Sequence, residues 1–579
     1  MVTCLALVSA NPPSRRHATL ARAAVALLAV VLYAGTLGHG FVYDDDLVVR
    51  SHTIVREQRF LRAFTTPYHS DASQTVETGL YRPLPILSFA LQYALHDGRP
   101  AAYHAANVAL HAIVSLLVLE LALALGVPLA AAAGAGMLFA AHPVHVEAVA
   151  GIAGRAELLS AGFYLAALIV YIRRSSAAGR MTTALLIFLA LLCKETAVTF
   201  PAAACGYSLL FRREKMLASA AAVVAPIAAY LVLRQAVLGA LLVPAASMTF
   251  VENPLVGLGL VSRLATAVAI CGRYAVLLVA PVRLSPDWGF AQLTPVSSPF
   301  DTGFLPGLAT LGAACALFAA TYRRRRVIAY LLLLLAVSYS IVSNTVVLIG
   351  IGMAERLLYL PSAAFCIAVA LAIAWGAGRF GARIALALAA VLLVAAGART
   401  VAAAATWRDD FTLFSAAETA APRSVKILGN LAVELIAQGR LDEAKTRLTR
   451  AAALAPDHVL TRINLAGVLL KTGDLDGAEA EVAAALRLEP DHPVGLAQLG
   501  AILRKRGALR EAEDALRRAV AANPRFVGAR LDLASLLIVR QAWDEAEREL
   551  REVLAIEPAS AAAQKGLAIV AERRAAAAR

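Results

Sequence analysis

Residues 430–456 read NLAVELIAQGRLDEAKTRLTRAAALAP, and residues 464–490, which read NLAGVLLKTGDLDGAEAEVAAALRLEP, repeat the pattern 34 positions later. The same step separates three sets of residues: Pro422, Pro456, Pro490, Pro524 and Pro558; Gly439, Gly473 and Gly507, with Gln541 in the fourth place; and Ala444, Ala478, Ala512 and Ala546. Small residues where helices cross, with a proline after the second helix, indicate repeated helix pairs. Each pair buries its apolar face only against neighbouring pairs, so the stretch predicts an α-solenoid.

The 34-residue period resembles the tetratricopeptide repeat (TPR). We predict four repeats over 424–559, a degenerate repeat or linker over 402–423 and a capping helix over 560–579. One polar side chain recurs at the same register position in each repeat: Asn430, Asn464, Gln498 and Asp532. These four are candidates for binding the backbone of an extended peptide, and helix packing is the alternative role for the same position.

The chain before the repeats has the composition of a membrane domain. Of its 579 residues 60 % are hydrophobic, whereas soluble proteins have about 45–50 %. Apolar segments over residues 1–401 predict about eleven spans: 19–38, 104–125, 128–142, 155–172, 181–197, 199–211, 216–238, 304–320, 327–350, 357–375 and 381–398. Segment 254–283 carries Arg263 and Arg273, so we expect a re-entrant or interfacial pair there. The predicted fold class is all-α, a polytopic membrane helix bundle followed by the solenoid.

Nearly all of the net charge of +14 belongs to the membrane part. From residue 401 onward 25 Lys and Arg face 24 Asp and Glu, and before it 29 face 16. The excess forms short clusters between apolar segments, such as Arg323–Arg326, as the positive-inside rule describes. This pattern indicates topology rather than nucleic-acid binding. It predicts an integral membrane protein with a cytoplasmic N-terminus and extracytoplasmic repeats.

This topology gathers the ionisable residues near the spans on the outer side: Asp44, Asp45, Asp46, His142, His145, Glu147, Arg155, Glu157, Lys194, Glu195, Asp287, Glu355 and Arg356. Such groups are costly at membrane depth, so they usually face a cavity and mark function. Each has an ordinary alternative role, as a helix cap, a packed structural histidine or an ion pair between helices. The histidine pair also lacks a third metal ligand at a fixed spacing. Their convergence on one face favours a functional site.

Seven stretches resemble, in order, the transmembrane and tetratricopeptide-repeat (TMTC) O-mannosyltransferases, membrane enzymes of the GT-C glycosyltransferase class. They are FVYDDDLVV, YRPLPILSFALQYALHDGRPAAYHAANVALH, HPVHVEAVAGIAGRAELLS, LCKETAVT, LSPDW, AERLLYLPS and RTVAAAATWRDDFTLFSAAETAAP. Two features depart from the family. Eukaryotic members carry more than four repeats, and Arg50, Ser51 and His52 stand where the family has an Asn after its paired acids.

The resemblance implies transfer of a sugar, mannose in this family, from a polyprenyl-phosphate donor to Ser or Thr hydroxyls of extracytoplasmic proteins. The repeats would bind the protein or peptide acceptor. The class places an acidic residue of the first external loop at the site as general base, and Asp44 and Asp45 match it. Cations stabilise the leaving phosphate, for which Arg155, Lys194 and Arg356 are candidates. The further site candidates are His142, His145, Glu147, Glu157, Glu195, Glu355 and Asp287. No cofactor is assigned, although two adjacent carboxylates can hold Mg²⁺ or Mn²⁺.

Two other functions stay open. One is a ligase or polymerase of surface-glycan assembly, which uses the same kind of donor. The other is a membrane protein without this chemistry, either a TPR scaffold or a transporter. A scaffold needs no such gathering of ionisable residues on one side. A transporter is expected to have paired broken helices in matching halves, which the sequence does not show.

Overall fold

The computed structural model describes residues 15–69, 79–212, 216–242, 248–298, 300–301 and 303–577. In these ranges every regular element is a helix. The chain divides into two compact units, Met1–Ala421 and Pro422–Arg579. The predicted all-α fold class is therefore confirmed.

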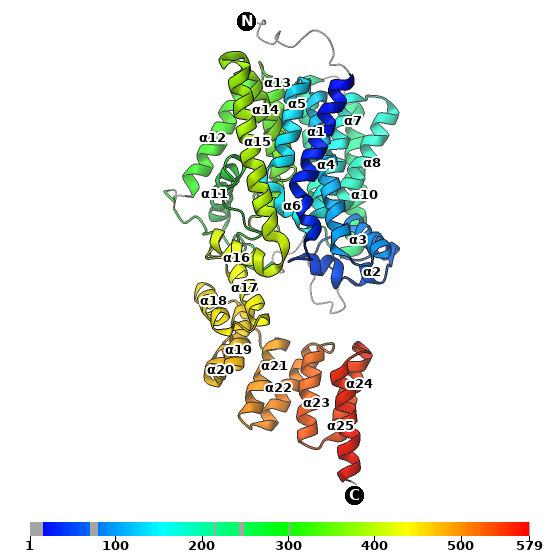
Figure 1. The fold of residues 1–579 in the computed structure, drawn as a ribbon, viewed down its shortest axis with the longest axis vertical. Coiled ribbons are helices and arrows are strands. Elements are labelled where there is room, and N and C mark those ends of the chain that lie inside the picture. Colours follow the sequence, from blue (N-terminus) through cyan, green and yellow to red (C-terminus); the bar gives the residue numbers. More distant parts are fainter. Residues whose placement is uncertain are drawn as a thin grey trace. The chain divides into compact units, whose positions relative to one another are not determined.

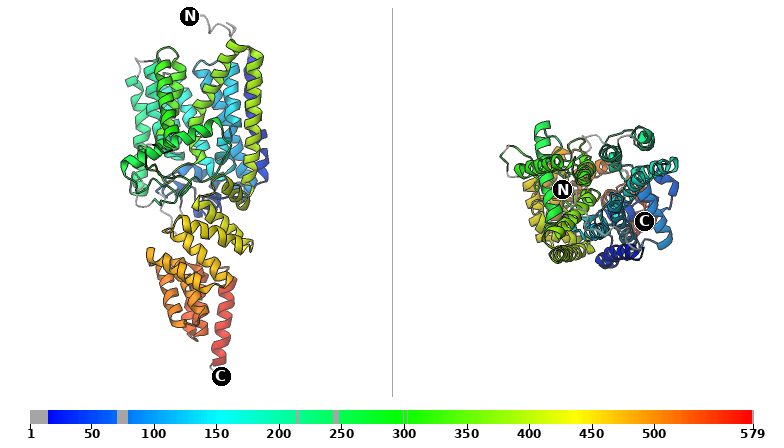
Figure 2. Two further views of the ribbon diagram at one scale, coloured as in Figure 1. Left: turned by 90° about the vertical axis from the view of Figure 1, so that its left-hand side faces the viewer. Right: turned by 90° about the horizontal axis from the view of Figure 1, so that it is seen from above.

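The first unit is a bundle of helices that lie side by side (Figures 1 and 2). Its longer helices are α1 (Arg15–Tyr33), α4 (Pro100–Ala124), α7 (Arg155–Arg173), α10 (Met216–Leu238), α11 (Leu260–Val279), α12 (Phe304–Thr321), α14 (Pro361–Phe380) and α15 (Ala382–Ala405). Its shorter helices are α2 (Thr53–Arg56), α3 (Pro83–His96), α5 (Leu129–Ala141), α6 (Val146–Ala150), α8 (Ala177–Cys193), α9 (Phe200–Phe211), α13 (Arg326–Ser340) and α16 (Asp410–Ala420). Of the described helices, 8 are long and apolar enough to cross a membrane, or 9 if the bent pair α5–α6 is one span. The protein is therefore a membrane protein with a helical bundle.

The predicted number of about eleven spans is too high, because the helices found in three of the predicted segments, α8, α9 and α13, are shorter than the other candidate spans. Segment 254–283 differs as well. Residues 254–283 contain one continuous helix, α11, that is long and apolar enough to cross a membrane, instead of a pair. The expected span 327–350 stops early, because α13 ends at Ser340. Beyond it Asn344 has a left-handed backbone (φ 58°), and its amide nitrogen donates to the Gly352 carbonyl at 3.2 Å. A polar turn therefore replaces the last part of that expected span.

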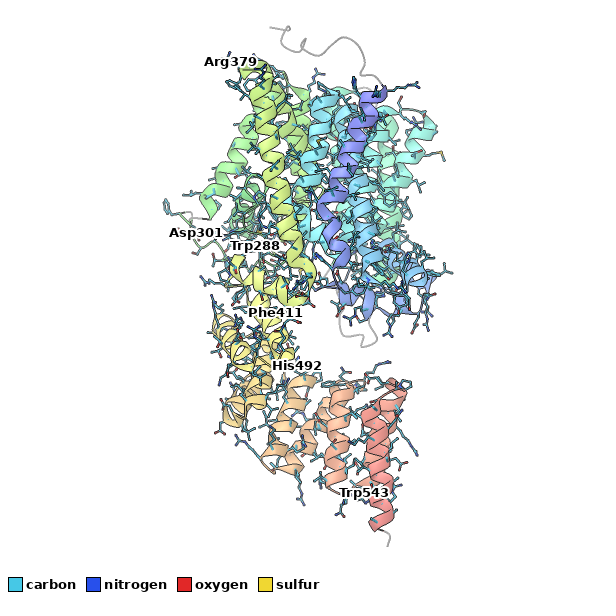
Figure 3. All side chains as sticks on the ribbon, viewed as in Figure 1. Trp288, Asp301, Arg379, Phe411, His492 and Trp543 are labelled. Carbon is cyan, nitrogen blue, oxygen red and sulfur yellow. The ribbon has the colours of Figure 1, made fainter. Side chains whose placement is uncertain are left out.

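The two ends of the bundle differ in chemistry. At one end Glu120 of α4 accepts hydrogen bonds from Arg22 of α1 and Arg173 of α7, both at 2.8 Å. Arg379 lies at this end and Trp288 at the opposite one (Figure 3). Helices α4 and α14 begin at that opposite end with a proline in the first turn, where its missing N–H costs no helical hydrogen bond. We call the end that holds Trp288 the site end.

The second unit consists of helix pairs. These are α17 (Val425–Ala437) with α18 (Leu441–Leu454), α19 (Val459–Thr472) with α20 (Leu475–Leu488), α21 (Pro493–Lys505) with α22 (Leu509–Ala522), and α23 (Val527–Val539) with α24 (Trp543–Ile556), followed by α25 (Ala561–Ala577). The periodic alanines, Ala444, Ala478, Ala512 and Ala546, are all 0 % exposed. Their small side chains let the two helices of each pair approach closely, as the period predicts.

The periodic glycines occupy the turn inside each pair. Gly439, Gly473 and Gly507 have φ values of 75°, 87° and 81°. This left-handed conformation suits glycine because it has no Cβ. In the fourth pair Gln541 adopts the same conformation, with φ 61°, although it carries a side chain. The backbone geometry of the turn is therefore set by the repeat rather than by the residue.

Candidate functional site

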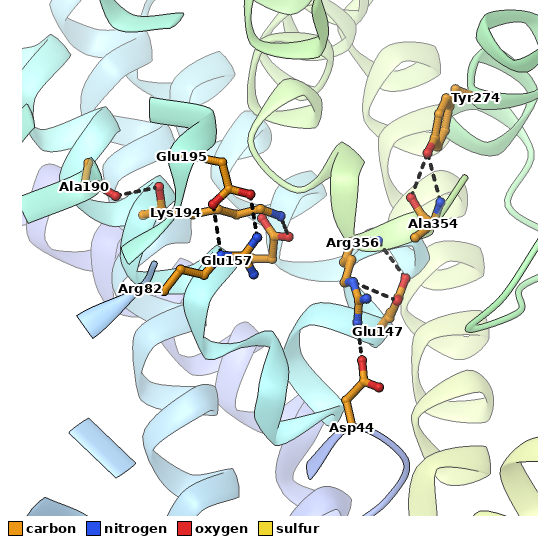
Figure 4. Close-up of polar contacts among 11 residues, drawn as sticks. Asp44, Arg82, Glu147, Glu157, Ala190, Lys194, Glu195, Tyr274, Ala354 and Arg356 are labelled. Carbon is orange, nitrogen blue, oxygen red and sulfur yellow. Dashed lines mark hydrogen bonds and ion pairs between the residues drawn. The ribbon is translucent and has the colours of Figure 1, made fainter. Parts of the chain in front are cut away.

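An arginine held between two carboxylates lies at the site end (Figure 4). Arg356, in the short helix Glu355–Leu358, donates from Nη1 to Asp44 Oδ2 at 3.0 Å. Its backbone N–H donates to Glu147 Oε2 at 2.8 Å, and its Nε lies 3.4 Å from Glu147 Oε1. The side chain of Glu147 is 1 % exposed, whereas those of Asp44 and Arg356 are 28 % and 25 % exposed. Glu147 therefore anchors Arg356 from inside, and Asp44 remains accessible.

The three consecutive aspartates have different environments. Asp45 is buried, and its two oxygens accept the backbone N–H groups of Ala153 at 2.8 Å and Val42 at 3.1 Å. Burial raises the pKa of Asp45 to about 7, although these backbone hydrogen bonds act in the opposite direction. Asp46 is exposed and pairs with Arg50 at 3.0 Å. Both oxygens of Asp45 are therefore engaged by the backbone, whereas Asp46 faces solvent.

A second set of ion pairs joins α3, α7 and the break between α8 and α9. The Arg82 guanidinium, just before α3, donates from Nη2 to Glu195 Oε1 at 2.6 Å and from Nε to Glu195 Oε2 at 3.0 Å. Lys194 forms an ion pair with Glu157 in the first turn of α7. The Arg82 guanidinium also lies over the Tyr68 ring, 5.3 Å from the ring centroid. Two cations and two carboxylates therefore meet here, as Figure 4 shows.

Tyr68 lies within electrostatic reach of both sets. Burial raises the pKa of its hydroxyl to about 12, while Arg82 and Arg356 lower it and Asp44 raises it. Glu147 and Glu157 also act on each other electrostatically. The two sets therefore form one group of charges, which we call the ionic cluster: Asp44, Arg82, Glu147, Glu157, Lys194, Glu195 and Arg356.

Arg155, a predicted phosphate ligand, is engaged in a structural role. It is 2 % exposed and donates from Nε to Asn107 Oδ1 at 2.9 Å and from Nη2 to the Tyr103 carbonyl at 3.0 Å. Its guanidinium lies 4.5 Å from the centroid of the Phe89 ring. These contacts fix the start of α7 against α3 and α4.

His142 and His145 also join helices. The Nε2 atom of His142 lies 2.9 Å from the Leu278 carbonyl, and Nε2 of His145 lies 2.7 Å from Ser362 Oγ. Nδ1 of His145 lies 2.8 Å from the Phe139 carbonyl, so both of its ring nitrogens are occupied. Across the residues that the structure describes, no three His, Cys, Asp or Glu side chains gather in positions that could hold a metal ion.

Glu355 and Asp287 shape the loop beside Arg356. Glu355 is 3 % exposed and accepts from the Ser285 N–H at 2.6 Å and from Trp288 Nε1 at 3.2 Å. Asp287 is buried, and its Oδ2 accepts the Gly289 N–H at 2.8 Å. These two carboxylates therefore order the loop that follows α11, which the hydrogen bonds of Glu355 tie to the helix bearing Arg356.

In the second unit the register residues form a row. Asn430, Asn464, Gln498 and Asp532 lie on α17, α19, α21 and α23, the first helix of each pair, and all four are half-buried. Neighbouring first helices contact each other. The Gln498 amide lies close to Gly467 of α19, where a Cβ would come within 3.0 Å of its nitrogen. The structure therefore brings the predicted acceptor-binding residues onto one series of adjacent helices.

The tetratricopeptide repeat family matches residues 412–499 and 503–569. Among solved structures, a TPR protein of Thermus thermophilus is 22 % identical and covers 31 % of this chain and 94 % of its own, with a TM-score of 0.26. MamA is 19 % identical and covers 27 % of this chain and 84 % of its own, with a TM-score of 0.24.

Curated relatives extend over the membrane part as well. Protein O-mannosyl-transferase F38B6.6 of Caenorhabditis elegans is 29 % identical over 435 residues, which are 74 % of this chain and 61 % of that protein. Protein O-mannosyl-transferase Tmtc1 of Drosophila melanogaster is 28 % identical, over 73 % of this chain and 60 % of its own length. Human protein O-mannosyl-transferase TMTC3 is 29 % identical over 58 % of this chain and 40 % of its own. The chain is TMTC-like. It spans about three fifths of the length of the first two relatives.

Two residues of this TMTC-like chain, Arg82 and Tyr68, lie at the site but are not among the site residues predicted from the sequence. Arg82 belongs to the stretch YRPLPILS, and its position directly before a helix-initiating proline was the available signal. Its partner Glu195 lies 113 positions away, so the pairing itself cannot be read from the sequence. Tyr68 stands alone in a polar loop and carries no sequence signal of its position between the two sets of charges.

Proposed function

We propose that this protein is a glycosyltransferase that moves a mannosyl residue from a polyprenyl-phosphate donor to a Ser or Thr hydroxyl of a protein acceptor. The names of its relatives, all protein O-mannosyl-transferases, support the reaction. The observation that carries the proposal is Asp44, an accessible carboxylate that Arg356 holds at 3.0 Å within a group of buried charges. A scaffold has no need of such an arrangement at the end of a membrane bundle.

Asp44 is the proposed general base. The acceptor oxygen attacks the anomeric carbon, its proton moves to the Asp44 carboxylate, and the bond from that carbon to the phosphate oxygen breaks. Negative charge then grows on the leaving polyprenyl phosphate, where the cations of the ionic cluster stabilise it. Arg356 holds and orients the Asp44 carboxylate through its hydrogen bond of 3.0 Å.

The geometry favours Asp44 over Asp45 for this role. Both oxygens of Asp45 are occupied by backbone N–H groups, and the residue is 1 % exposed. A base must reach the hydroxyl proton, and a carboxylate fixed in this way does not. Asp45 therefore acts as a positioning residue that fastens the loop bearing Asp44 to the turn before α7.

The test is transfer of radiolabelled mannose from polyprenyl-phosphate mannose to protein in purified membranes. We expect Asp44→Asn to reduce the rate roughly 10²–10⁴-fold, as loss of a general base does. Asp46→Asn is the matched control, because Asp46 is the adjacent acid and is exposed. Equal rates for wild type and Asp44→Asn, at equal protein levels, would contradict the assignment and favour the scaffold. Label found in a glycan rather than in protein would favour the surface-glycan enzyme.

We further propose that the site end and the repeats are extracytoplasmic. The basic residues Arg173 and Arg379 lie at the end of the bundle away from the ionic cluster, which supports a cytoplasmic location for that end. A reporter that is active only outside the cytoplasm, fused after residue 400, should give signal. Activity of a cytoplasm-only reporter at the same place would reverse this orientation.

The repeats are proposed to bind the acceptor through the row that contains Asn430, Asn464, Gln498 and Asp532. Asparagine and glutamine amides carry both donors and an acceptor, so they can pair with the backbone of an extended peptide. Truncation from about residue 424 should leave donor binding intact and impair transfer to protein. If the truncated enzyme modifies the same acceptors at an unchanged rate, the repeats do not select them.

A further inference from the structure

Each cation of the ionic cluster is paired with a carboxylate of the chain itself. Arg82 pairs with Glu195, Lys194 with Glu157, and Arg356 with Asp44 and Glu147. A site that binds an anionic ligand needs positive charge, and in such a site an internal carboxylate can occupy the place of the ligand. The question is which of these pairs can open.

In the Arg82–Glu195 pair the carboxylate can be replaced most easily by an anionic ligand. Glu195 is 33 % exposed, the most accessible carboxylate of the cluster, while Arg82 is 14 % exposed. Lys194 and Glu157 are only 6 % and 11 % exposed, so their pair is closed off. Arg356 is already engaged by Asp44 and by the buried Glu147. Glu195 is therefore the carboxylate of the cluster best placed to leave its partner for solvent.

We propose that Arg82 binds the phosphate of the lipid-linked donor, and that Glu195 occupies that position until the donor displaces it. This inference rests on the proposed function and adds to it a donor-binding residue and an internal competitor. It also adds Arg82 to the phosphate-binding candidates named from the sequence, Arg155, Lys194 and Arg356.

The geometry of the pair matches the ligand. Glu195 is bound through two parallel hydrogen bonds of 2.6 and 3.0 Å, from Nη2 and Nε of the same guanidinium. Two oxygens of a phosphate accept the same fork, which is why arginine recognises carboxylate and phosphate alike. Tyr68 lies against the guanidinium and limits its rotation, so the fork is oriented before the donor arrives.

The position of Arg82 also suits transfer. The Tyr68 ring lies 5.3 Å from the Arg82 guanidinium, and Figure 4 draws Arg82 and the Asp44–Arg356 pair in one close-up. In the proposed arrangement the attached sugar would extend from Arg82 to the proposed base, Asp44. Lys194, the chain neighbour of Glu195, acts electrostatically on Arg82 and Glu195. The positive charge at the phosphate therefore does not depend on Arg82 alone.

The experiment measures binding of radiolabelled undecaprenyl phosphate and dolichyl phosphate to the purified full-length protein in detergent. Arg82→Lys keeps the charge and loses the fork, so we expect at least a tenfold weaker affinity. Glu195→Gln removes the competing anion, so we expect tighter binding. The matched controls are Arg22→Lys and Glu120→Gln, an arginine–glutamate pair at the opposite end of the bundle. Both controls should bind like wild type.

The outcomes are distinct. Unchanged binding in both cluster variants, or weaker binding in Glu195→Gln, would overturn the inference, because the pair would then be structural only. If Arg82→Lys does not fold, Glu195→Gln decides alone. Equal competition by phosphatidylglycerol would assign the site to anionic lipids in general and overturn the donor assignment, whereas competition by inorganic phosphate without competition by phosphatidylglycerol supports it. If wild type binds neither polyprenyl phosphate, the proposed function itself is wrong.

Discussion

Replacing Asp45 by Asn tests whether this carboxylate is a structural clamp whose stability depends on pH. Asp45 accepts two backbone N–H groups, from Ala153 at 2.8 Å and Val42 at 3.1 Å. An Asn side chain offers one acceptor oxygen, so one of the two N–H groups loses its partner. Leaving a buried donor unsatisfied costs about 1–3 kcal/mol. We therefore expect Asp45→Asn to unfold more readily than wild type at low pH.

The pH dependence follows from the pKa of the folded state. Burial raises the pKa of Asp45 from its ordinary 3.8 to about 7. Between these values the folded protein keeps a proton that the unfolded chain has released, so stability falls as pH rises and levels off above pH 7. Each pH unit in this range changes the free energy of unfolding by about 1.4 kcal/mol. The titration of Asp45 therefore lowers the free energy of unfolding of wild type by roughly 2–3 kcal/mol between pH 5 and 7. Asp45→Asn has no titrating carboxyl at this position. The difference in the free energy of unfolding between wild type and Asp45→Asn should therefore narrow as the pH rises from 5 to 7.

The assay is thermal unfolding of the two proteins in the same detergent at pH 5, 6, 7 and 8, followed by intrinsic fluorescence. Asp46→Asn is the control, because Asp46 is exposed and its replacement should leave the pH profile of wild type unchanged. A gap between wild type and Asp45→Asn that stays constant from pH 5 to 8 would refute the reasoning. It would mean that Asp45 does not titrate in this range.

Three further predictions test other parts of the molecule. Arg356→Lys cannot bridge Asp44 and Glu147 as the guanidinium does, so the rate of mannosyl transfer should fall about tenfold or more. The affinity for a polyprenyl phosphate should change little, and a loss confined to that affinity would contradict this role. Gln541→Gly relieves a left-handed backbone with φ 61° and should stabilise the repeat unit by roughly 1 kcal/mol in a circular-dichroism melt of residues 422–579, and an unchanged or lower melting temperature would show that the turn is not strained. Asn464→Ala removes one amide of the acceptor row and should raise KM for protein acceptor about threefold to tenfold without changing donor binding, a split that a general folding defect does not produce.

The repeat unit was predictable in detail because its determinants are local. The period fixes which residues meet, so the burial of Ala444 and the positive φ of Gly439 follow from spacing alone. The membrane helices were also predictable from apolar length. The ends of these helices were less predictable. Helix α13 ends before the polar turn that Asn344 forms, and the summed hydropathy of a segment does not reveal such a turn.

The ionic cluster shows where sequence reasoning ends. Asp44 and Asp45 are adjacent and chemically identical, and no local rule separates them. Their difference comes from partners far along the chain, since Asp44 meets Arg356, 312 positions away, and Asp45 meets Ala153, 108 positions away. Arg155 shows the converse, because its charge and position suggested a phosphate ligand while its contacts with Asn107 and Tyr103 commit it to packing. A charged residue at the end of a span is thus a candidate site residue because its charge is costly near the membrane. Its partners in the fold decide whether that charge faces a ligand or a neighbouring helix.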